Sequence, residues 1–229
     1  MRMLGDKVKR KVAMVPDEYI LPVIERYHNA TEQDFVSGEY RSKRYHISKD
    51  IKTILFCINA LDWKPKDSLE GKEVIMPDPQ TTNYYPEWYE WEDILTPLLD
   101  WVQDQFYGKG FLNKCMIALM KPDGRIPLHW DQDPSFTVSR RLHIPLVTHP
   151  NVDFKIDGES YYLQKHTLYE VNNLRPHTVY NGSNIVRAHL IMDYYHPKNL
   201  HNLIYGTDEY DLETGMRDYW PDISISFSH

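Results

Sequence analysis

The side chains whose types and spacing could do chemistry lie in the second half of this 229-residue sequence. His129 and Asp131 come shortly after the turn dipeptide Asp123-Gly124 and are two positions apart. Residues two apart in a β-strand point to the same face, so both could bind one metal ion. His177, at the start of a later predicted strand, offers a third ligand. Two imidazoles and one carboxylate leave open coordination positions, as non-haem Fe(II) oxygenases require, whereas a structural zinc site wants four ligands and typically cysteine.

Basic side chains on two other predicted strands could bind an anionic ligand beside this metal. Arg187 comes on the strand after His177, and an inward-facing guanidinium, which is always protonated, needs an anion. A dicarboxylic co-substrate that chelates iron at one end would bring its other carboxylate to Arg187. Arg141 and His143 share one face of the strand after the first two ligands and could hold the metal-bound end. Taken alone, Arg187 could equally be a salt-bridged arginine, so the prediction depends on the ordered set.

Four motifs follow one another along about residues 112–197. They are Ile126-Pro127-Leu128-His129-Trp130-Asp131, Arg141-Leu142-His143-Ile144-Pro145-Leu146, Glu170-Val171-Asn172-Asn173-Leu174-Arg175-Pro176-His177 and Arg187-Ala188-His189-Leu190-Ile191-Met192-Asp193. Their order and spacing resemble the aspartyl/asparaginyl β-hydroxylase family of Fe(II)/2-oxoglutarate-dependent oxygenases, which includes bacterial enzymes that hydroxylate free proline. The resemblance covers well under half of the chain.

The resemblance implies a jelly-roll core in which the three ligands named above bind Fe(II), with 2-oxoglutarate and O2 as co-substrates. It also implies that Arg187 binds the far carboxylate of 2-oxoglutarate, with Arg141 and His143 near the keto-acid end. Some members of the family hold the far carboxylate with a serine on the strand before the first histidine. This sequence has Ala118 and Met120 in that region and no clear serine there.

The implied reaction is hydroxylation of an aliphatic C–H group of an amino acid, free or within a polypeptide, with release of succinate and CO2. Asp131 occupies the position that a halide would need, which favours hydroxylation over halogenation. Two other classes of function remain open. One is a non-catalytic jelly roll that binds a metal or small ligand without consuming 2-oxoglutarate; the other is a different metal-dependent jelly-roll enzyme, such as an isomerase or a 2-oxoglutarate-independent dioxygenase.

Short strands are the elements that must position these residues. The apolar pattern alternates with a period of two in Leu112–Met120, Leu142–Thr148, Val152–Ile156, Tyr161–Gln164, Thr167–Val171, Thr178–Tyr180 and Arg187–Tyr194. Turn dipeptides such as Asp157-Gly158 and Asn181-Gly182 separate them. We therefore expect a mainly β fold with flanking helices, a cupin-like double-stranded β-helix or jelly roll. We prefer it to an immunoglobulin-like sandwich because its mouth can hold a metal.

The first part of the chain has a less regular pattern. Tyr19–Tyr27 has apolar residues at near-helical spacing, and Pro22 predicts the start of a helix rather than its interior. Thr53–Ile58 predicts a buried strand. We expect one structural domain, in which a helix and strand extension over residues 1–110 packs on a jelly-roll core over residues 111–197. An acidic tail or lid over residues 198–229 follows.

Between the predicted strand and the core, an aromatic-rich loop is expected to precede a helix. Asp78–Asp93 has the prolines and polar residues of a loop, and its aromatic side chains could cover the core or line a pocket. Thr96 is a candidate N-cap, Pro97 suits the first helical position, and Gly108 or Gly110 could end the helix.

Composition limits the other classes of function. The formal net charge of −7 disfavours binding to nucleic acid, and no apolar run approaches the ~18 residues that span a bilayer. The chain start lacks the apolar stretch of a secretory signal, so we expect a cytoplasmic protein with an amino-acid or peptide substrate. Cys57 and Cys115 are expected to be buried free thiols rather than a disulfide, and the basic Lys7–Lys11 segment a solvated end. The sequence does not indicate the oligomeric state.

Overall fold

The structure, a computed structural model, describes residues 8–45, 49–59, 82–105, 111–131 and 139–195. The strands are β1 (Lys9–Met14), β2 (Ile51–Asn59), β3 (Thr82–Tyr84), β4 (Phe111–Met120), β5 (Arg125–His129), β6 (Arg140–Val147), β7 (Val152–Ile156), β8 (Glu159–Tyr161), β9 (Thr167–Val171), β10 (His177–Asn181) and β11 (Arg187–Tyr195). The helices are α1 (Asp17–His28), α2 (Val36–Tyr45), α3 (Pro86–Asp104) and a 3₁₀ turn over Glu32–Phe35.

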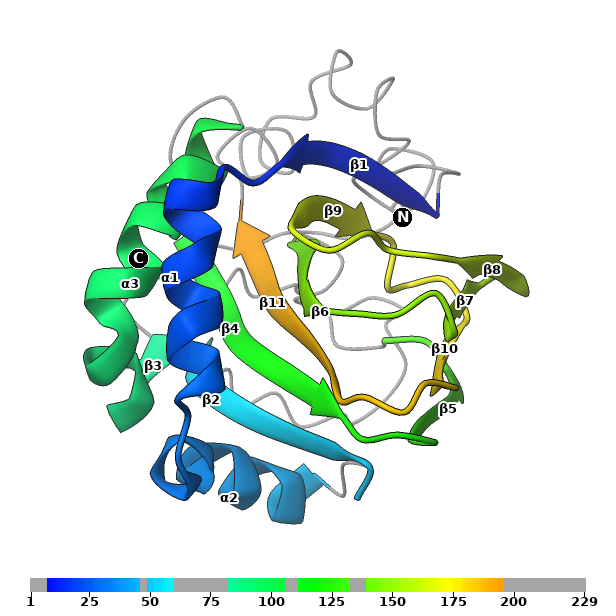
Figure 1. The fold of residues 1–229 in the computed structure, drawn as a ribbon, viewed down its shortest axis with the longest axis horizontal. Coiled ribbons are helices and arrows are strands. Elements are labelled where there is room, and N and C mark those ends of the chain that lie inside the picture. Colours follow the sequence, from blue (N-terminus) through cyan, green and yellow to red (C-terminus); the bar gives the residue numbers. More distant parts are fainter. Residues whose placement is uncertain (1–7, 46–48, 60–81, 106–110, 132–138, 196–229) are drawn as a thin grey trace, which may run out of the picture.

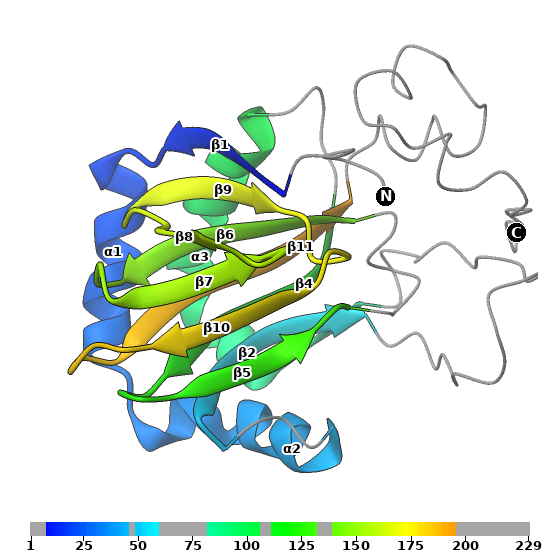
Figure 2. The same cartoon turned by 90° about the vertical axis from the view of Figure 1, so that its right-hand side faces the viewer.

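The strands form two sheets whose connections define a jelly roll. The larger sheet has seven strands in the order β1-β9-β6-β11-β4-β2-β3, and the smaller has four in the order β5-β10-β7-β8. From β4 to β11 the chain passes back and forth between the two sheets, and every pair of neighbouring strands is antiparallel. Figure 2 shows the sheets facing each other. The predicted mainly β, double-stranded β-helix fold is confirmed.

The large sheet separates an apolar core from the space between the sheets. Along β11, Ala188, Leu190 and Met192 pack into the core cluster beneath the helices. The alternate residues Arg187 and Ile191 line the space between the sheets, because successive strand residues point to opposite faces. Figure 1 shows α1 and α3 on one side of the large sheet and the small sheet on the other. One strand therefore contributes both to the core and to the site.

Strands from the first part of the chain extend the large sheet at both ends. β2 pairs with β4, and β1 pairs with β9. The prediction that Lys7–Lys11 forms a solvated end is therefore wrong from Lys9 onward, because Lys9 begins β1. Glu170 of β9 is 1% exposed and accepts hydrogen bonds from Arg10 at 2.7 Å and Arg140 at 3.0 Å. Arginines of the two strands that flank β9 thus neutralise its buried carboxylate.

Helix α3 begins eleven residues earlier than the sequence predicted, at Pro86 instead of Pro97, with Tyr85 rather than Thr96 as the N-cap residue. Pro86 occupies the first helical position, which proline tolerates because it needs no N–H partner there. The part of the predicted aromatic loop that follows it is helical, and Trp91 is fully buried against Phe56 with ring centroids 5.2 Å apart. Burial of this ring outweighs the cost of Pro97 inside the helix. The predicted end at Gly108 or Gly110 lies outside the described residues, as does the predicted tail or lid over 198–229.

Two further boundaries differ from the sequence predictions. Pro22 was expected to start a helix, but it lies inside α1, where Ile20 and Val23 are fully buried in the core. A strand was predicted over Tyr161–Gln164, whereas β8 ends at Tyr161 and the backbone N–H of Gln164 donates to the Tyr169 hydroxyl at 3.1 Å. In both places a tertiary contact overrides the local pattern.

The two cysteines are free thiols, as predicted. Cys57 of β2 and Cys115 of β4 lie opposite each other in register, and both are fully buried. Burial raises the pKa of Cys57 to about 12 and the pKa of Cys115 well above its ordinary value. Both side chains therefore remain protonated at neutral pH and pack as small apolar groups.

Helix α2 packs on β2 through a close approach at Gly38. A Cβ atom added at Gly38 would lie 1.8 Å from the carbonyl oxygen of Thr53, which is backbone and cannot move aside alone. Glycine is therefore needed here by the contact between helix and strand. The contact holds the middle of β2 in place from outside the sheet.

Replacing Gly38 with alanine should lower the free energy of unfolding by about 1–3 kcal/mol, because the added methyl group forces α2 away from β2. Urea unfolding followed by circular dichroism would measure this change. Glu39→Ala, at the next and exposed position, is the matched control and should change stability little. Equal stability of the Gly38→Ala and Glu39→Ala proteins would contradict the close packing described here.

Candidate metal centre and its cavity

The structure brings the three predicted metal ligands together. His129 ends β5 and His177 begins β10, and the two residues are opposite each other in the antiparallel pair. Asp131 follows β5, and its Oδ1 lies 3.8 Å from Nε2 of His129. One ligand atom from each of the three residues lies within 4.8 Å of the others. The cluster has the composition and compactness of a site for a single divalent ion.

Backbone carbonyls orient both imidazole rings. Nδ1 of His129 lies 2.8 Å from the carbonyl oxygen of Pro127, and Nδ1 of His177 lies 2.9 Å from that of Arg175. A carbonyl can only accept, so each Nδ1 carries a proton, and in the neutral ring Nε2 keeps the lone pair that can bind a metal. Burial lowers the pKa of His177, which favours the neutral ring that a metal needs.

Asp131 is held as a carboxylate by its neighbours. Its Oδ2 accepts a hydrogen bond from Nδ2 of Asn173 at 2.8 Å and lies 3.2 Å from Nη1 of Arg141. Burial alone would raise the pKa of Asp131, but the charge of Arg141 and the Asn173 hydrogen bond outweigh it and hold the pKa below its usual value. Since Oδ2 is occupied, Oδ1, which faces His129, is the oxygen available to a metal.

Arg141 is itself fixed by a second carboxylate. Its Nε and Nη2 form a two-pronged ion pair with Asp193 of β11, the Nη2 contact at 2.9 Å. Nζ of Lys114 lies 3.4 Å from the same carboxylate. The guanidinium therefore bridges Asp131 and Asp193 in a network drawn from β4, β6, β11 and the segment just after β5.

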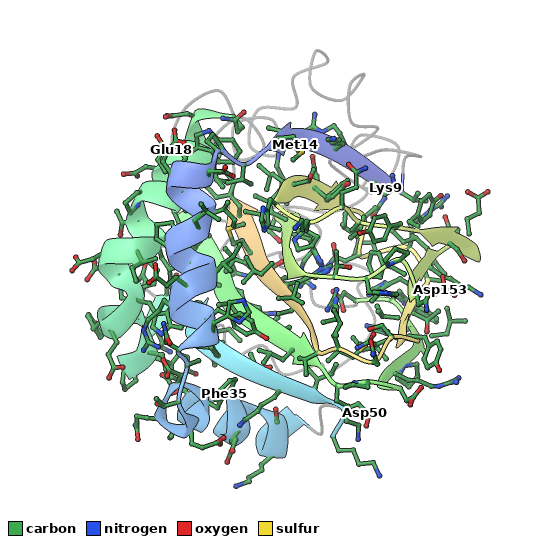
Figure 3. The ribbon with its side chains drawn as sticks, in the orientation of Figure 1. Lys9, Met14, Glu18, Phe35, Asp50 and Asp153 are labelled. Carbon is green, nitrogen blue, oxygen red and sulfur yellow. The ribbon has the colours of Figure 1, made fainter. Side chains whose placement is uncertain are left out.

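A cavity of about 410 Å³ lies beside the three ligands, between the two sheets. Its walls are mostly apolar, with side chains such as Met116, Phe154 and Ile191. The predicted co-substrate residues Arg141, His143 and Arg187 line it too. Figure 3 draws the side chains of the strands around this space, with Asp153 labelled on the side of the small sheet. The cavity joins the metal cluster to a cationic group in otherwise apolar surroundings.

Arg187 is buried without a carboxylate partner among the described residues. The residue is 2% exposed, its Nη2 lies 2.7 Å from Nδ1 of His189, and its Nε has no hydrogen-bond partner within the part of the chain that the structure describes. Burial lowers the pKa of Arg187 to about 9, so the side chain is still charged at neutral pH. A buried cation of this kind favours an anion from outside the chain.

His143 lies next to this arginine. It is 6% exposed, and its Nδ1 lies 3.4 Å from Nδ1 of His189. Burial and then the charges of Arg187 and Arg141 lower the pKa of His143 well below its ordinary value. His143 is therefore a neutral imidazole on the cavity wall.

Three residues that support the site were not identified from the sequence. Asn173 and Asp193 lie inside the quoted motifs, but a role for them requires knowledge of their distant partners, Asp131 and Arg141. Thr53 lines the cavity from β2, and only its place on a buried strand was readable from the sequence. Trp130, between two ligands, is 54% exposed and does not line the cavity.

Asn173→Ala should weaken binding of a divalent ion about 10–100-fold, because Asp131 loses the hydrogen bond that orients it. Titration of the protein with Mn(II) or Co(II) under anaerobic conditions would give the dissociation constants. Asn184→Ala, at an exposed position, should bind the same ions as the unchanged protein does. Unchanged affinity in Asn173→Ala would show that Asp131 is not a ligand oriented by this contact.

Residues 96–197 match the model of the aspartyl/asparaginyl β-hydroxylase family. The resemblance to this family is confirmed. The matched segment contains all three candidate metal ligands and the cavity-lining Arg141 and Arg187. The same match agrees with the expected enzyme class, a hydroxylase. The sequence matches no curated protein.

Several solved structures are similar to this chain. An oxidoreductase of the 2OG-Fe(II) oxygenase family from Burkholderia pseudomallei is 18% identical over 63% of this chain and 67% of its own, with a TM-score of 0.43. Viral collagen prolyl hydroxylase from Paramecium Bursaria Chlorella virus-1, in a complex with 2OG, is 9% identical over 82% of this chain and 96% of its own, with a TM-score of 0.46. A cupin domain from Bordetella pertussis is 16% identical over 40% of this chain and 88% of its own, with a TM-score of 0.31. Because these TM-scores are low, the fold assignment rests on the strand order of this chain.

Within the described ranges, no helix has both the length and the apolar surface that crossing a bilayer requires.

Proposed function

We propose that this protein is an Fe(II)- and 2-oxoglutarate-dependent dioxygenase that hydroxylates an aliphatic C–H group of an amino acid, free or within a polypeptide. The observation that carries the proposal is one cavity with the His129, Asp131 and His177 cluster on its wall and the buried cation of Arg187 also facing it. A metal site without catalysis would not require a buried, unneutralised guanidinium in the same cavity.

The donor set fits Fe(II). Two imidazole nitrogens and one carboxylate oxygen are available, and the second oxygen of that carboxylate is already hydrogen-bonded. The ligand cluster found among the described residues has three members, which leaves coordination positions for exchangeable groups. Thiolates, which would favour zinc, are absent from it, since both cysteines lie in the core cluster.

The cavity also fits a dicarboxylic keto acid. Arg187 would bind the far carboxylate, with its unpartnered Nε as one donor. His143 and the cavity-facing side of Arg141 would lie near the keto-acid end, beside Asp131. Arg141 would then both orient a metal ligand and contact the co-substrate.

Bound iron, together with 2-oxoglutarate and O2, would supply the oxidation that releases succinate and CO2 and places a hydroxyl group on the substrate. The chain's own residues would bind the iron and 2-oxoglutarate and exclude water. The apolar wall formed by residues such as Phe154 and Ile191 keeps water from the reacting groups. Asp131 would fill the coordination position that a halide needs, so hydroxylation would be favoured over halogenation.

The proposal predicts that the purified chain, reconstituted with Fe(II), converts 2-oxoglutarate to succinate and consumes O2, and that a suitable amino acid stimulates both. Succinate measured by mass spectrometry and O2 uptake by electrode, with each of the protein amino acids in turn, would test it. His177→Ala and Asp131→Ala should abolish succinate formation, because each removes a metal ligand.

His28→Ala is the matched control, since His28 is exposed at the end of α1, and it should keep full turnover. Stimulation by none of the free amino acids, with slow succinate formation retained, would indicate a peptide or protein substrate. Metal binding with no succinate formed under any condition would instead favour a non-catalytic jelly roll.

A further inference from the structure

Unpartnered polar atoms gather on the cavity side of the large sheet. Oγ1 of Thr53, Nε of Arg187 and Nε2 of His189 are all buried and have no hydrogen-bond partner within the described part of the chain. Their residues are 2%, 2% and 1% exposed. Thr53 and Arg187 line the cavity, and His189 bonds to Arg187. Buried polar groups are normally hydrogen-bonded, so three unpartnered polar atoms on the same side of the sheet indicate that a ligand binds there.

The strand register brings these residues together across β4. Thr53 of β2 and His189 of β11 are both paired with Ala118 of β4, one from each side. Arg187 is two residues before His189, on the same face. Two strand spacings separate the backbones of Thr53 and His189 by about 10 Å, and the small side chain of Ala118 between them leaves room for a bound group.

We propose that Thr53 completes the binding site for the far carboxylate of 2-oxoglutarate. Its hydroxyl group would donate a hydrogen bond to one carboxylate oxygen, while Arg187 binds the carboxylate through its free Nε. The proposal rests on the function proposed above. It accounts for the lack of a clear serine on β4, where Ala118 stands. The hydroxyl instead comes from β2, outside residues 96–197, which match the family.

His189 has a positioning role in this arrangement. Arg187 donates through Nη2 to Nδ1 of His189, so that ring accepts and must be neutral. Burial and the charge of Arg187 lower the pKa of His189 well below its ordinary value, in agreement with a neutral ring. The contact fixes the plane of the guanidinium and leaves Nε for the ligand.

The first part of the chain holds Thr53 in place. Helix α2 approaches the backbone of Thr53 so closely that only glycine fits at position 38. On the other edge of this stretch of β2, the backbone is paired with β4. The backbone that carries the hydroxyl is therefore fixed before a ligand arrives, which lowers the entropy lost on binding.

The test compares Thr53→Val, which keeps the shape but removes the hydroxyl, with Thr53→Ser, which keeps the hydroxyl. The dissociation constant of 2-oxoglutarate would be measured anaerobically by calorimetry on the full chain loaded with Mn(II). Thr53→Val should weaken binding about 10-fold or more, because a hydrogen bond to a charged group is lost, and Thr53→Ser should stay within a few-fold of the unchanged protein. Thr96→Val, at an exposed position of α3, is the matched control and should bind normally.

Thermal unfolding separates this role from a structural one. Without ligand, Thr53→Val should melt at or above the temperature of the unchanged protein, because valine removes an unsatisfied buried hydroxyl. With 2-oxoglutarate and Mn(II), its gain in melting temperature should be smaller than that of the unchanged protein. A lower melting temperature without ligand, together with normal affinity for 2-oxoglutarate, would overturn the proposed role of Thr53.

The outcomes also distinguish this inference from the proposed function. Equal affinity of the Thr53→Val and unchanged proteins for 2-oxoglutarate would overturn the inference and leave the proposed function standing. An unchanged protein that binds Mn(II) but no 2-oxoglutarate would overturn both.

Discussion

The antiparallel pairing of β5 with β10 is the constraint on which the site depends. The register places His129 opposite His177, and the ring centroids of the two side chains are 4.2 Å apart. A shift of one residue in either strand would turn one imidazole to the other face of the small sheet. The backbone N–H of Asp131 donates to the carbonyl oxygen of Asn173 at 3.0 Å, which extends the contact between these two segments past the end of β5. The same segments therefore carry the three candidate metal ligands and fix the distances between them.

The charges on the cavity wall are distributed unevenly, so the two ends of the cavity differ chemically. At one position Arg141 and Lys114 lie beside the carboxylates of Asp131 and Asp193, so two positive and two negative groups balance. At Arg187 the positive charge has no acidic counterpart among the described residues. A ligand with two anionic ends would find a metal with its carboxylate at one end and this cation at the other. The chain thus favours a particular orientation of a dicarboxylate before any substrate binds.

Features set by local sequence were predictable, and features set by distant contacts were not. Period-two alternation and turn dipeptides located β4, β6, β7, β9, β10 and β11 of the jelly roll, but not β5, the strand that carries His129. The helix start at Pro86 was missed because Pro97 satisfies the same local rule, and only the burial of the intervening segment decides between them. Asn173 carries no sign of its role, since an asparagine in a loop usually serves a turn. Recognising such residues requires the three-dimensional fold.

The buried carboxylate of Glu170 affects how this protein could be divided. The family segment begins at residue 96, yet Arg10, which neutralises Glu170 together with Arg140, belongs to the first strand of the sheet. A fragment that begins at residue 96 would lack β1 and β2 and would therefore expose the hydrogen-bonding edges of β9 and β4. It would also remove one of the two cations beside the buried carboxylate of Glu170. The segment that matches the family therefore depends on β1 and β2, which lie outside it, for a complete sheet and for the second cation beside Glu170.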